Sequence, residues 1–433
     1  MARYYQVISA DGHVETPPDP WVKYVPEKWK DRAPRLINLP DGGEGWIIEG
    51  QPLLKNGQNI TGRGPIRFDF GSYYKPDGSF NDGAGGPVQR LREQDEDGVD
   101  AEVLFPPVFA SRFLEGIKDP DIYRSMIRAY NSWLAYDYCS VAPDRLIGNS
   151  VTPISDIDHA VAEVEFAKSA GLKSVAFYMF PNGTGFAQPE DDRFWAKCLE
   201  LDMAISPHFG FGEVRAPVGQ PGAGTAGQPY ASALVQRAGS HAPVYCMAQL
   251  MAAGVFDRFP EIKFYFAESN ASWLPSTMFF MDDNHEIFSN AFGGRRMELT
   301  PSEYIAKHCF FSIIRDPVAV ELADHLPIDN IMWGTDFPHP EGTWPATFEA
   351  LKSTFFDIPI HESRRMLGLS AAEAFGFDIE KLRPLAEKIG PTPSDLGQLT
   401  DTQTEQDLID RWAPVKQVGR HWLTGHDFPL YPV

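Results

Sequence analysis

The sequence predicts a (β/α)8 barrel, also called a TIM barrel, with a long insertion after the first strand and a C-terminal extension. Eight short apolar segments follow one another along the chain, and most of them alternate with segments whose apolar residues recur at helical spacing. Such alternation is typical of a parallel sheet covered by helices, and eight units suit a closed barrel. No expected strand is followed by GxGxxG or GxxxxGKS/T, so an open nucleotide-binding sheet fits the sequence less well.

The individual elements follow from the positions at which these patterns change. The expected strands are residues 4–10, 101–108, 145–153, 172–181, 203–210, 263–269, 307–316 and 330–339. The expected helices are residues 87–100, 119–143, 156–171, 191–202 and 243–260, with further helical stretches between and after the last two strands.

Two parts of the chain depart from this repeat. Residues 16–85 are rich in Gly and Pro and form an insertion, whose aromatic residues are expected either to roof the site or to belong to a subunit interface. These aromatic residues are Trp21, Trp46, Phe68, Phe70, Tyr73 and Tyr74. From residue 379 the chain becomes polar, so we expect residues 1–378 to form the catalytic barrel and residues 379–433 an arm. The arm is expected to pack on a neighbouring subunit or on its own barrel, and its aromatic residues predict a homo-oligomer.

Composition excludes several classes of partner. The chain has 433 residues and a formal charge of −21, which phosphate groups would repel, so we expect no nucleic acid partner. No run reaches the ~18 to 20 apolar residues of a membrane span, and the N-terminus lacks a signal-like pattern. A cytoplasmic protein is therefore expected. The four cysteines are scattered without CxxC spacing, which predicts buried free thiols.

Polar residues terminate several of the expected strands. In a TIM barrel the carboxyl ends of the strands carry the chemistry, so these residues are the candidates for a functional site. They are Asp11, His13 and Glu15 after the first strand, His208 after the fifth, Glu268 after the sixth, Arg315 after the seventh, and Asp336 and His339 after the eighth.

These residue types together predict a metal site. A single Asp or His at a strand end commonly caps a helix or bonds to a loop. Several carboxylates that converge at one edge would repel one another without a cation. Asp, Glu and His are the ligands of Zn, Mn and Fe, so we expect a divalent metal, as one or two ions.

Four stretches then show a resemblance to a known family: "ADGHVETPP", "SPHFG", "MAAGVFDRFPEIKFYFAESNASWLP" and "MWGTDFPHPEGTWP". With these the chain resembles the amidohydrolase superfamily, in its amidohydrolase-related branch of metal-dependent TIM-barrel enzymes, over roughly residues 5 to 378. The resemblance implies metal ligands at Asp11, His13, His208 and Asp336. The branch includes nonoxidative decarboxylases of small aromatic and related carboxylic acids, as well as hydrolases.

The chain departs from the family pattern in three places. Its first motif is Asp-Gly-His where HxH is common, and Glu268 stands where a histidine is more usual. The only lysine of the fourth strand, Lys173, lies at the wrong end of that strand to bridge two metals. A two-metal hydrolase with a carboxylated lysine is therefore disfavoured.

Further residues are candidates for binding and proton transfer. Asp336, His208 and His241 are the expected catalytic residues, and His241 begins a helix beside the site. Arg315 is expected to hold a substrate carboxylate or a local ion pair, and His339 to orient a ligand or bind substrate. The glycine-rich residues 211–230 lack the lysine of a phosphate-binding loop and are expected to form a mobile lid.

The predicted function is that of a metal-dependent lyase or hydrolase. It would decarboxylate or hydrolyse a small carboxylated or carbonyl-bearing organic molecule, with an acid (His241 or Asp336) that protonates carbon or with Asp336 as the base. Asp11, His13, His208 and Asp336 already suffice for one ion, so Glu15 and Glu268 are additional ligands. The alternative is therefore a dinuclear nonheme iron or manganese oxygenase on the same barrel.

Overall fold

The computed structural model confirms the predicted TIM barrel. It describes residues 4–38, 43–49, 51–55, 72–107, 117–208, 241–291, 297–356 and 358–398, together with residues 114 and 211. Eight strands pair in parallel in the order β1-β5-β6-β7-β8-β9-β10-β11. They are β1 (Ile8–His13), β5 (Ala101–Phe105), β6 (Leu146–Val151), β7 (Ser174–Phe177), β8 (Ala204–Pro207), β9 (Phe264–Phe266), β10 (Cys309–Ile313) and β11 (Ile331–Trp333).

The barrel closes between its first and last strands. Gly12 forms a parallel bridge with Phe337, just beyond β11. The Asp336 amide donates to the Asp11 carbonyl at 2.8 Å, and the His13 amide donates to the Phe337 carbonyl at 2.7 Å. The two segments with the largest number of predicted ligands are therefore joined directly by backbone hydrogen bonds.

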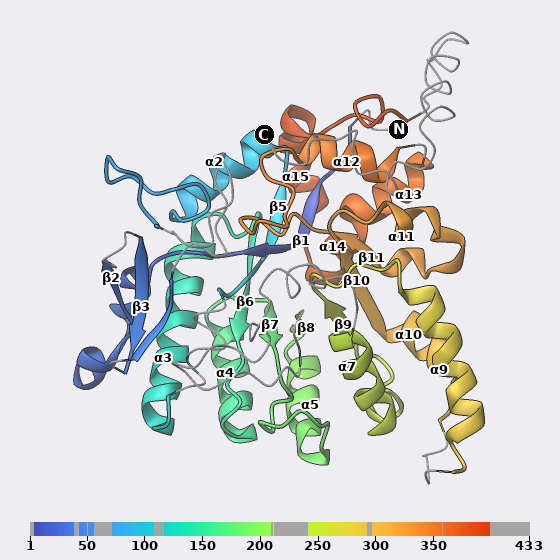
Figure 1. Cartoon of the computed structure of the whole chain (residues 1–433), viewed down its shortest axis with the longest axis horizontal. Coiled ribbons are helices and arrows are strands. Elements are labelled where there is room, and N and C mark those ends of the chain that lie inside the picture. Colours follow the sequence, from blue (N-terminus) through green and yellow to red (C-terminus); the bar gives the residue numbers. More distant parts are fainter. Residues whose placement is uncertain are drawn as a thin grey trace, which may run out of the picture.

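Helices surround the strands (Figure 1). The α-helices are α1 (Asp19–Val22), α2 (Pro87–Asp97), α3 (Pro120–Trp133), α4 (Ile157–Ser169), α5 (Asp192–Glu200), α7 (His241–Ala252), α8 (Val255–Arg258), α9 (Leu274–Phe288), α10 (Pro301–His308), α11 (Pro317–Glu321), α12 (Thr347–Phe355), α13 (Ile360–Arg364), α14 (Ser370–Phe375) and α15 (Ile379–Ile389). Short 3₁₀-helices are Glu27–Arg32, Cys139–Val141, Pro189–Asp191, Ala323–His325 and Ile328–Asn330, and π-helical turns are Leu134–Tyr138 and Arg365–Leu369. None of the helices described has the length and apolar character of a membrane span.

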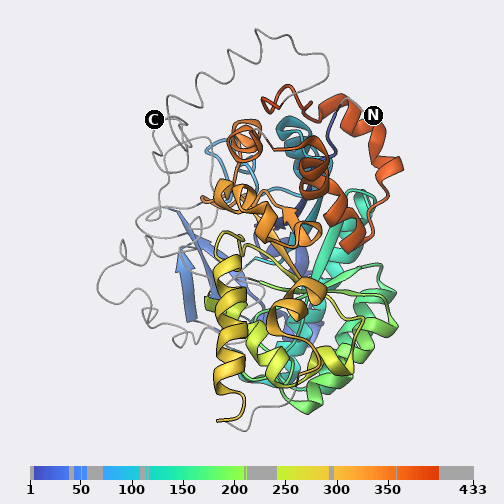
Figure 2. The ribbon, with the colours of Figure 1, turned by 90° about the vertical axis from the view of Figure 1, so that its right-hand side faces the viewer.

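The insertion contains a small antiparallel sheet that the sequence pattern did not predict. It consists of β2 (Arg35–Asn38), β3 (Glu44–Ile48) and β4 (Gln51–Lys55), and it lies to one side of the barrel in Figures 1 and 2. Trp46 of β3 is buried and donates its indole N–H to the Tyr73 hydroxyl at 2.7 Å. The Trp21 ring meets Tyr130 of α3 edge to face, with 6.0 Å between ring centroids. These insertion aromatics pack within the chain itself, whereas Phe68 and Phe70 lie outside the described residues.

The described part of the predicted arm packs on its own barrel. Leu382 and Ala386 of α15 are buried. Farther along, the Tyr5 amide donates to the Pro391 carbonyl at 2.7 Å, and the Tyr5 hydroxyl bonds to Gln398. Residues 399–433 lie outside the described residues.

Apolar packing closes the interior of the barrel away from the predicted site. Inward-facing Val103, Tyr265 and Met332 pack with Phe375 of α14 and with Phe377 just after it. A second, larger apolar cluster lies between the strands and the surrounding helices. All four cysteines are buried free thiols, as predicted. The candidate site lies at the carboxyl end of the strands.

Candidate metal centre

The side chains of strand β1 begin the site. Asp11 and His13 are two residues apart, and both are almost completely buried, at 0% and 1% exposed. The His13 Nε2 atom lies 3.6 Å from Asp11 Oδ1 and 3.3 Å from Asp336 Oδ1. The His208 Nε2 atom, just past β8, lies 3.3 Å from His13 Nε2 and 3.8 Å from Asp11 Oδ1. Strands β1, β8 and β11 thus direct these groups to one point.

Two carboxylates reach this point through an unusual backbone conformation. Glu268 follows β9 and Asp336 follows β11, and both have left-handed φ angles, 52° and 53°. Residues other than glycine rarely adopt this region, and the strain is of the order of 1–3 kcal/mol. The Glu268 amide donates to Ser312 Oγ at 2.8 Å, and the Asp336 amide donates to the Asp11 carbonyl; these two hydrogen bonds maintain the two turns. Such strain at two carboxylates that face one cluster is typical of a functional site.

His339 and Glu15 extend the cluster. His339 Nδ1 lies 2.9 Å from Asp336 Oδ1, and its Nε2 lies 3.3 Å from Glu15 Oε1. The His339 ring stacks on the His13 ring, with centroids 3.9 Å apart. Burial raises the pKa of Glu15, while the hydrogen bond from His339 opposes this effect. His339 thus connects Glu15 to the rest of the cluster.

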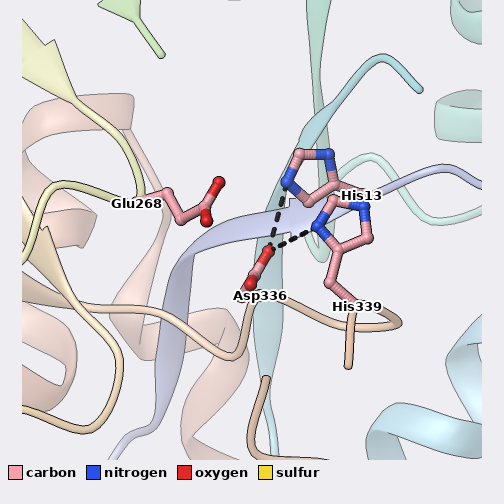
Figure 3. Close-up of side chains that lie close together, drawn as sticks. All are labelled: His13, Glu268, Asp336 and His339. Atoms are coloured by element: carbon pink, nitrogen blue, oxygen red, sulfur yellow. Dashed lines mark ion pairs between the residues drawn. The ribbon is translucent and has the colours of Figure 1, made fainter. Parts of the chain in front are cut away.

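Donor atoms of the cluster form two groups that share His13. Donor atoms of His13, Glu268, Asp336 and His339 all lie within 4.8 Å of one another, and those of Asp11, His13 and His208 do so as well. Figure 3 shows the first group, with Glu268 facing the other three across a gap and with Asp336 paired to both histidines.

Burial shifts the pKa of these groups in opposite directions. Desolvation raises the pKa of Asp11, and it raises the pKa of Glu268 well above its usual range, with Asp336 adding to the effect. Desolvation lowers the pKa of His13 well below its usual range, so its imidazole is neutral near pH 7 and offers a lone pair. Burial opposes charge on both His339 and Asp336, but their mutual attraction prevails, raising the pKa of His339 and lowering that of Asp336.

Several buried oxygens in the cluster lack donors. Within the described part of the chain, neither oxygen of Asp11 or Asp336 receives a hydrogen bond of normal geometry, although Asp336 Oδ1 lies within ion-pair distance of two histidines. Glu268 Oε1 also lacks a donor. Leaving a buried polar group unpaired costs roughly 1–3 kcal/mol. A cation would satisfy these oxygens, and a mixed imidazole and carboxylate set suits Zn, Mn or Fe, so the residues present fit a divalent metal.

Other predicted residues lie elsewhere or outside the described set. His241 is the first residue of α7, but its side chain is not among those described. Arg315 follows β10, is half-buried and donates to the Glu341 carbonyl at 2.6 Å. Lys173 precedes β7 and donates to the Gly376 carbonyl, away from the cluster, as predicted. The predicted lid, residues 211–230, lies outside the described residues except for residue 211.

A buried polar network beside the cluster was absent from the sequence-based prediction. Arg90 of α2 pairs with Glu102 of β5, with 2.6 Å between Nε and Oε2. The Thr335 hydroxyl also bonds to Glu102, at 3.1 Å. The segment "PVQRLREQDEDG" is as polar as a surface helix, and no local signal distinguishes its buried arginine from its exposed one, Arg92.

Comparisons with known proteins agree with the barrel fold. A family model described as amidohydrolase matches residues 79–377. An amidohydrolase from Mycobacterium avium subsp. paratuberculosis is 19% identical with a TM-score of 0.64, covering 87% of this chain and 100% of its own. A 5-carboxyvanillate decarboxylase from Novosphingobium aromaticivorans, in complex with manganese and 4-hydroxy-3-methoxy-5-nitrobenzoic acid, is 15% identical with a TM-score of 0.58, covering 86% and 96%. A 2,6-dihydroxybenzoate decarboxylase from Rhizobium is 16% identical with a TM-score of 0.57, covering 86% and 99%.

Proposed function

The chain belongs to the amidohydrolase family, and from this premise we propose that it is a metal-dependent lyase or hydrolase. Its substrate is a small carboxylated or carbonyl-bearing organic molecule, and two of the similar structures, being decarboxylases, favour decarboxylation over hydrolysis. One observation carries the proposal. Asp11, His13, His208, Glu268 and Asp336 converge from four strands at the mouth of the barrel, and several of their oxygens lack donors.

The residues have distinct roles in this proposal. Asp11, His13, His208 and Asp336 would hold the ion, and Glu268 faces His13 and Asp336 across a gap (Figure 3). When bound, the ion supplies Lewis-acid polarisation of a substrate oxygen or activates a water molecule. The neutral imidazole of His13 is suited to binding, since its pKa is lowered by burial. His339 orients Asp336 through the 2.9 Å contact between its Nδ1 and Asp336 Oδ1.

Proton transfer is assigned to Asp336 or His241, and substrate binding to Arg315 and His339. Asp336 is the base in hydrolysis, and either Asp336 or His241 donates the proton to carbon in decarboxylation. The ion pair with His339 lowers the pKa of Asp336 against the effect of burial, which favours His241 as the proton donor. Arg315 and His339 are proposed to contact a substrate carboxylate, because a guanidinium can bind it by two parallel hydrogen bonds.

Metal removal and reloading test this proposal. Protein purified without chelator is analysed for metal per chain, stripped, and reloaded separately with zinc, manganese and ferrous iron. Carbon dioxide release from a panel of hydroxylated aromatic acids and acid release from matched esters are then measured. We expect reloading to restore one of the two activities, and D336N to lose both bound metal and activity. The control is D158N, an exposed position on α4. Activity that survives complete chelation would overturn the proposal.

A dinuclear iron or manganese oxygenase is the second candidate. It is favoured by the number of donors, because the cluster contains four carboxylates and three imidazoles, whereas one ion takes three or four protein ligands. These donors are Asp11, Glu15, Glu268, Asp336, His13, His208 and His339. None of the three similar structures is described as an oxygenase, so the comparisons give this alternative no support.

Metal stoichiometry separates the two candidates. In a dinuclear centre, E15Q would lower the metal content from two ions per chain to one, and the iron-loaded protein would consume O₂ in the presence of a reductant. In a mononuclear centre, the wild type and E15Q both bind one ion. The latter result would eliminate the oxygenase.

Two further properties remain part of the proposal. A homo-oligomer is supported by exposed apolar side chains on one helix, α9, where Phe279 and Phe280 are 64% and 56% exposed and Ile287 is 57% exposed. A cytoplasmic location is supported by four buried cysteines that form no disulfide. Light scattering of the concentrated protein tests the first property, and a monomer would contradict it.

A further inference from the structure

Arg90 contacts the two segments that carry proposed metal ligands, which are β1 and the residues after β11. It lies on α2 and is 2% exposed. One terminal nitrogen of its guanidinium donates to the His13 carbonyl at 2.8 Å, and the other lies 3.4 Å from the Phe337 carbonyl. The guanidinium also lies 4.4 Å from the centroid of the Phe337 ring. A single cation therefore spans the seam at which β1 meets the segment after β11.

The surrounding residues are adapted to this close approach. A Cβ atom at Gly12 would lie 2.7 Å from an Arg90 terminal nitrogen, so a larger residue there would displace the guanidinium. Glu102 of β5 accepts from Arg90 and also from Gln94 Nε2, at 2.5 Å. The Thr335 hydroxyl, 3.1 Å from Glu102, lies 3.3 Å from the Asp11 carbonyl. The network thus reaches the backbone of three ligand residues: Asp11, His13 and, through Phe337, Asp336.

A contribution to stability alone does not account for this arrangement. Burying an ion pair costs desolvation on both sides, and apolar residues of similar size often serve a fold equally well. A guanidinium has donors in a fixed planar fork, so it can set the separation of two carbonyls while it pairs with a carboxylate. These carbonyls belong to segments whose side chains must be placed within a few tenths of an ångström to bind a metal.

We propose that Arg90 is a positioning residue for the metal centre, and that it fixes the spacing of the β1 and β11 segments across the seam. The inference rests on the proposed metal-dependent function. Arg90 contacts no ligand atom, and it acts through the backbone of the residues that do. Its loss should weaken metal binding about 10- to 100-fold, the range seen when a group that orients a metal ligand is removed.

The test uses variants that separate positioning from folding. R90M alone leaves the Glu102 carboxylate buried without its cation, so the double variant R90M/E102Q removes both charges while the amide can still accept from Thr335. R90K keeps the positive charge but replaces the planar guanidinium, with its fixed set of N–H donors, by a single ammonium group. The matched control is R145M, because Arg145 also donates to backbone carbonyls, those of Asp100 and Val99, but does so where the chain enters β5.

Two measurements are made on each folded variant. The first is the metal dissociation constant, by calorimetry on stripped protein. The second is hydrogen exchange, in metal-free protein, of the two amides that cross the seam, those of His13 and Asp336. We expect R90M/E102Q to lose affinity and to exchange these amides faster, R90K to be intermediate, and R145M to keep the wild-type values of both.

The outcomes separate this inference from the proposed function. Wild-type affinity and wild-type exchange in folded R90M/E102Q would overturn the positioning role. If the wild-type protein binds no metal, the proposed function fails, and the exchange measurement still decides whether Arg90 holds the seam. Equal loss of affinity in R145M would show a general effect of destabilisation and would also overturn the inference.

Discussion

Two sets of buried carboxyl groups in this protein differ in what surrounds them. Asp97 and Asp100 lie where the chain leaves α2 and enters β5. Asp97 accepts from the Thr347 hydroxyl at 2.5 Å, and Asp100 accepts from the Val7 amide at 2.9 Å. Asp11 and Asp336 lie at the opposite end of the barrel, and among the described residues no donor of normal hydrogen-bond geometry reaches their four oxygens.

Burial is therefore a poor guide to function by itself. Desolvation raises the pKa of Asp97 to about 7 and that of Asp100 to about 8, and it also raises the pKa of Asp11. The two sets differ in whether their carboxyl groups converge on one another. Each carboxyl group of the first set has its own local donor, whereas those of the second face one another and three histidines. The first set stabilises the fold through individual hydrogen bonds, and the second fits the proposed cation.

The largest expected difference between the sets is in metal affinity. D11N replaces an anionic ligand with a neutral one, and loss of the ion's contribution of several kcal/mol would lower activity by about 10³-fold or more. D100N is expected to keep wild-type affinity, because its amide oxygen can still accept from the Val7 amide. Calorimetric titration and metal analysis of both variants measure this. Equal losses would show that the two sets do not differ as described.

The next largest effect is the pH dependence of stability. The folded pKa of Asp100 is raised from 3.8 to about 8, so the folded state holds a proton that the unfolded state releases above about pH 4. Its stabilising contribution is complete below pH 4 and is lost as the pH rises to 8. By linkage the loss over this interval is of the order of 6 kcal/mol.

Denaturant unfolding in the presence of chelator tests this at pH 5 and pH 8.5. D100N should be less sensitive to pH than the wild type over this interval, because an amide does not titrate. The exposed control D158N should retain the wild-type slope. A wild-type slope in D100N would assign the pH dependence to other groups.

A smaller effect concerns the free energy of unfolding with and without metal. A ligand present at 100 times its dissociation constant stabilises a protein by about 2.7 kcal/mol. We expect the wild type and D100N to gain this amount on addition of metal, and D11N to gain much less. Thermal unfolding of the three proteins with and without added metal measures the gain. A full gain in D11N would place the metal away from Asp11.

The barrel and the types of ligand were predictable because both leave local signals. Apolar runs marked all eight strands, and the polar residue at the end of a run, such as His208 or Glu268, stands out against it. The small sheet of the insertion was missed because β2 and β4 are short and lie among Gly and Pro. Only the type of residue, and not the left-handed backbone at Glu268 and Asp336, can be read from the sequence.

The supporting network could not be predicted, because its partners are distant in sequence. Arg90 and Phe337 are 247 residues apart, and they meet only because the barrel closes. Within α2, Arg90, Glu93 and Gln94 are buried although most residues of the helix are polar, so its composition predicts a solvated surface. Tertiary contacts overrode that local preference.

The last and smallest expected effect tests how closely the placement of the Asp11 and Asp336 carboxylates depends on backbone spacing. A Cβ atom at Gly334 would lie 2.6 Å from Asp11 Cβ and 3.1 Å from the Asp11 amide nitrogen. The added carbon meets the Cβ atom and the backbone of Asp11, which no side-chain rotation can move aside. G334A must therefore push β11 away from β1. Overpacking of this kind costs about 1–3 kcal/mol. All the side chains proposed as metal ligands remain in G334A, so metal affinity should fall less than in D11N. G185A is the control, because no atom lies within 4 Å of the added carbon and surface changes stay within about 0.5 kcal/mol. Unfolding free energy and metal affinity that match the wild type in G334A would show that the seam tolerates a wider spacing than the site geometry implies.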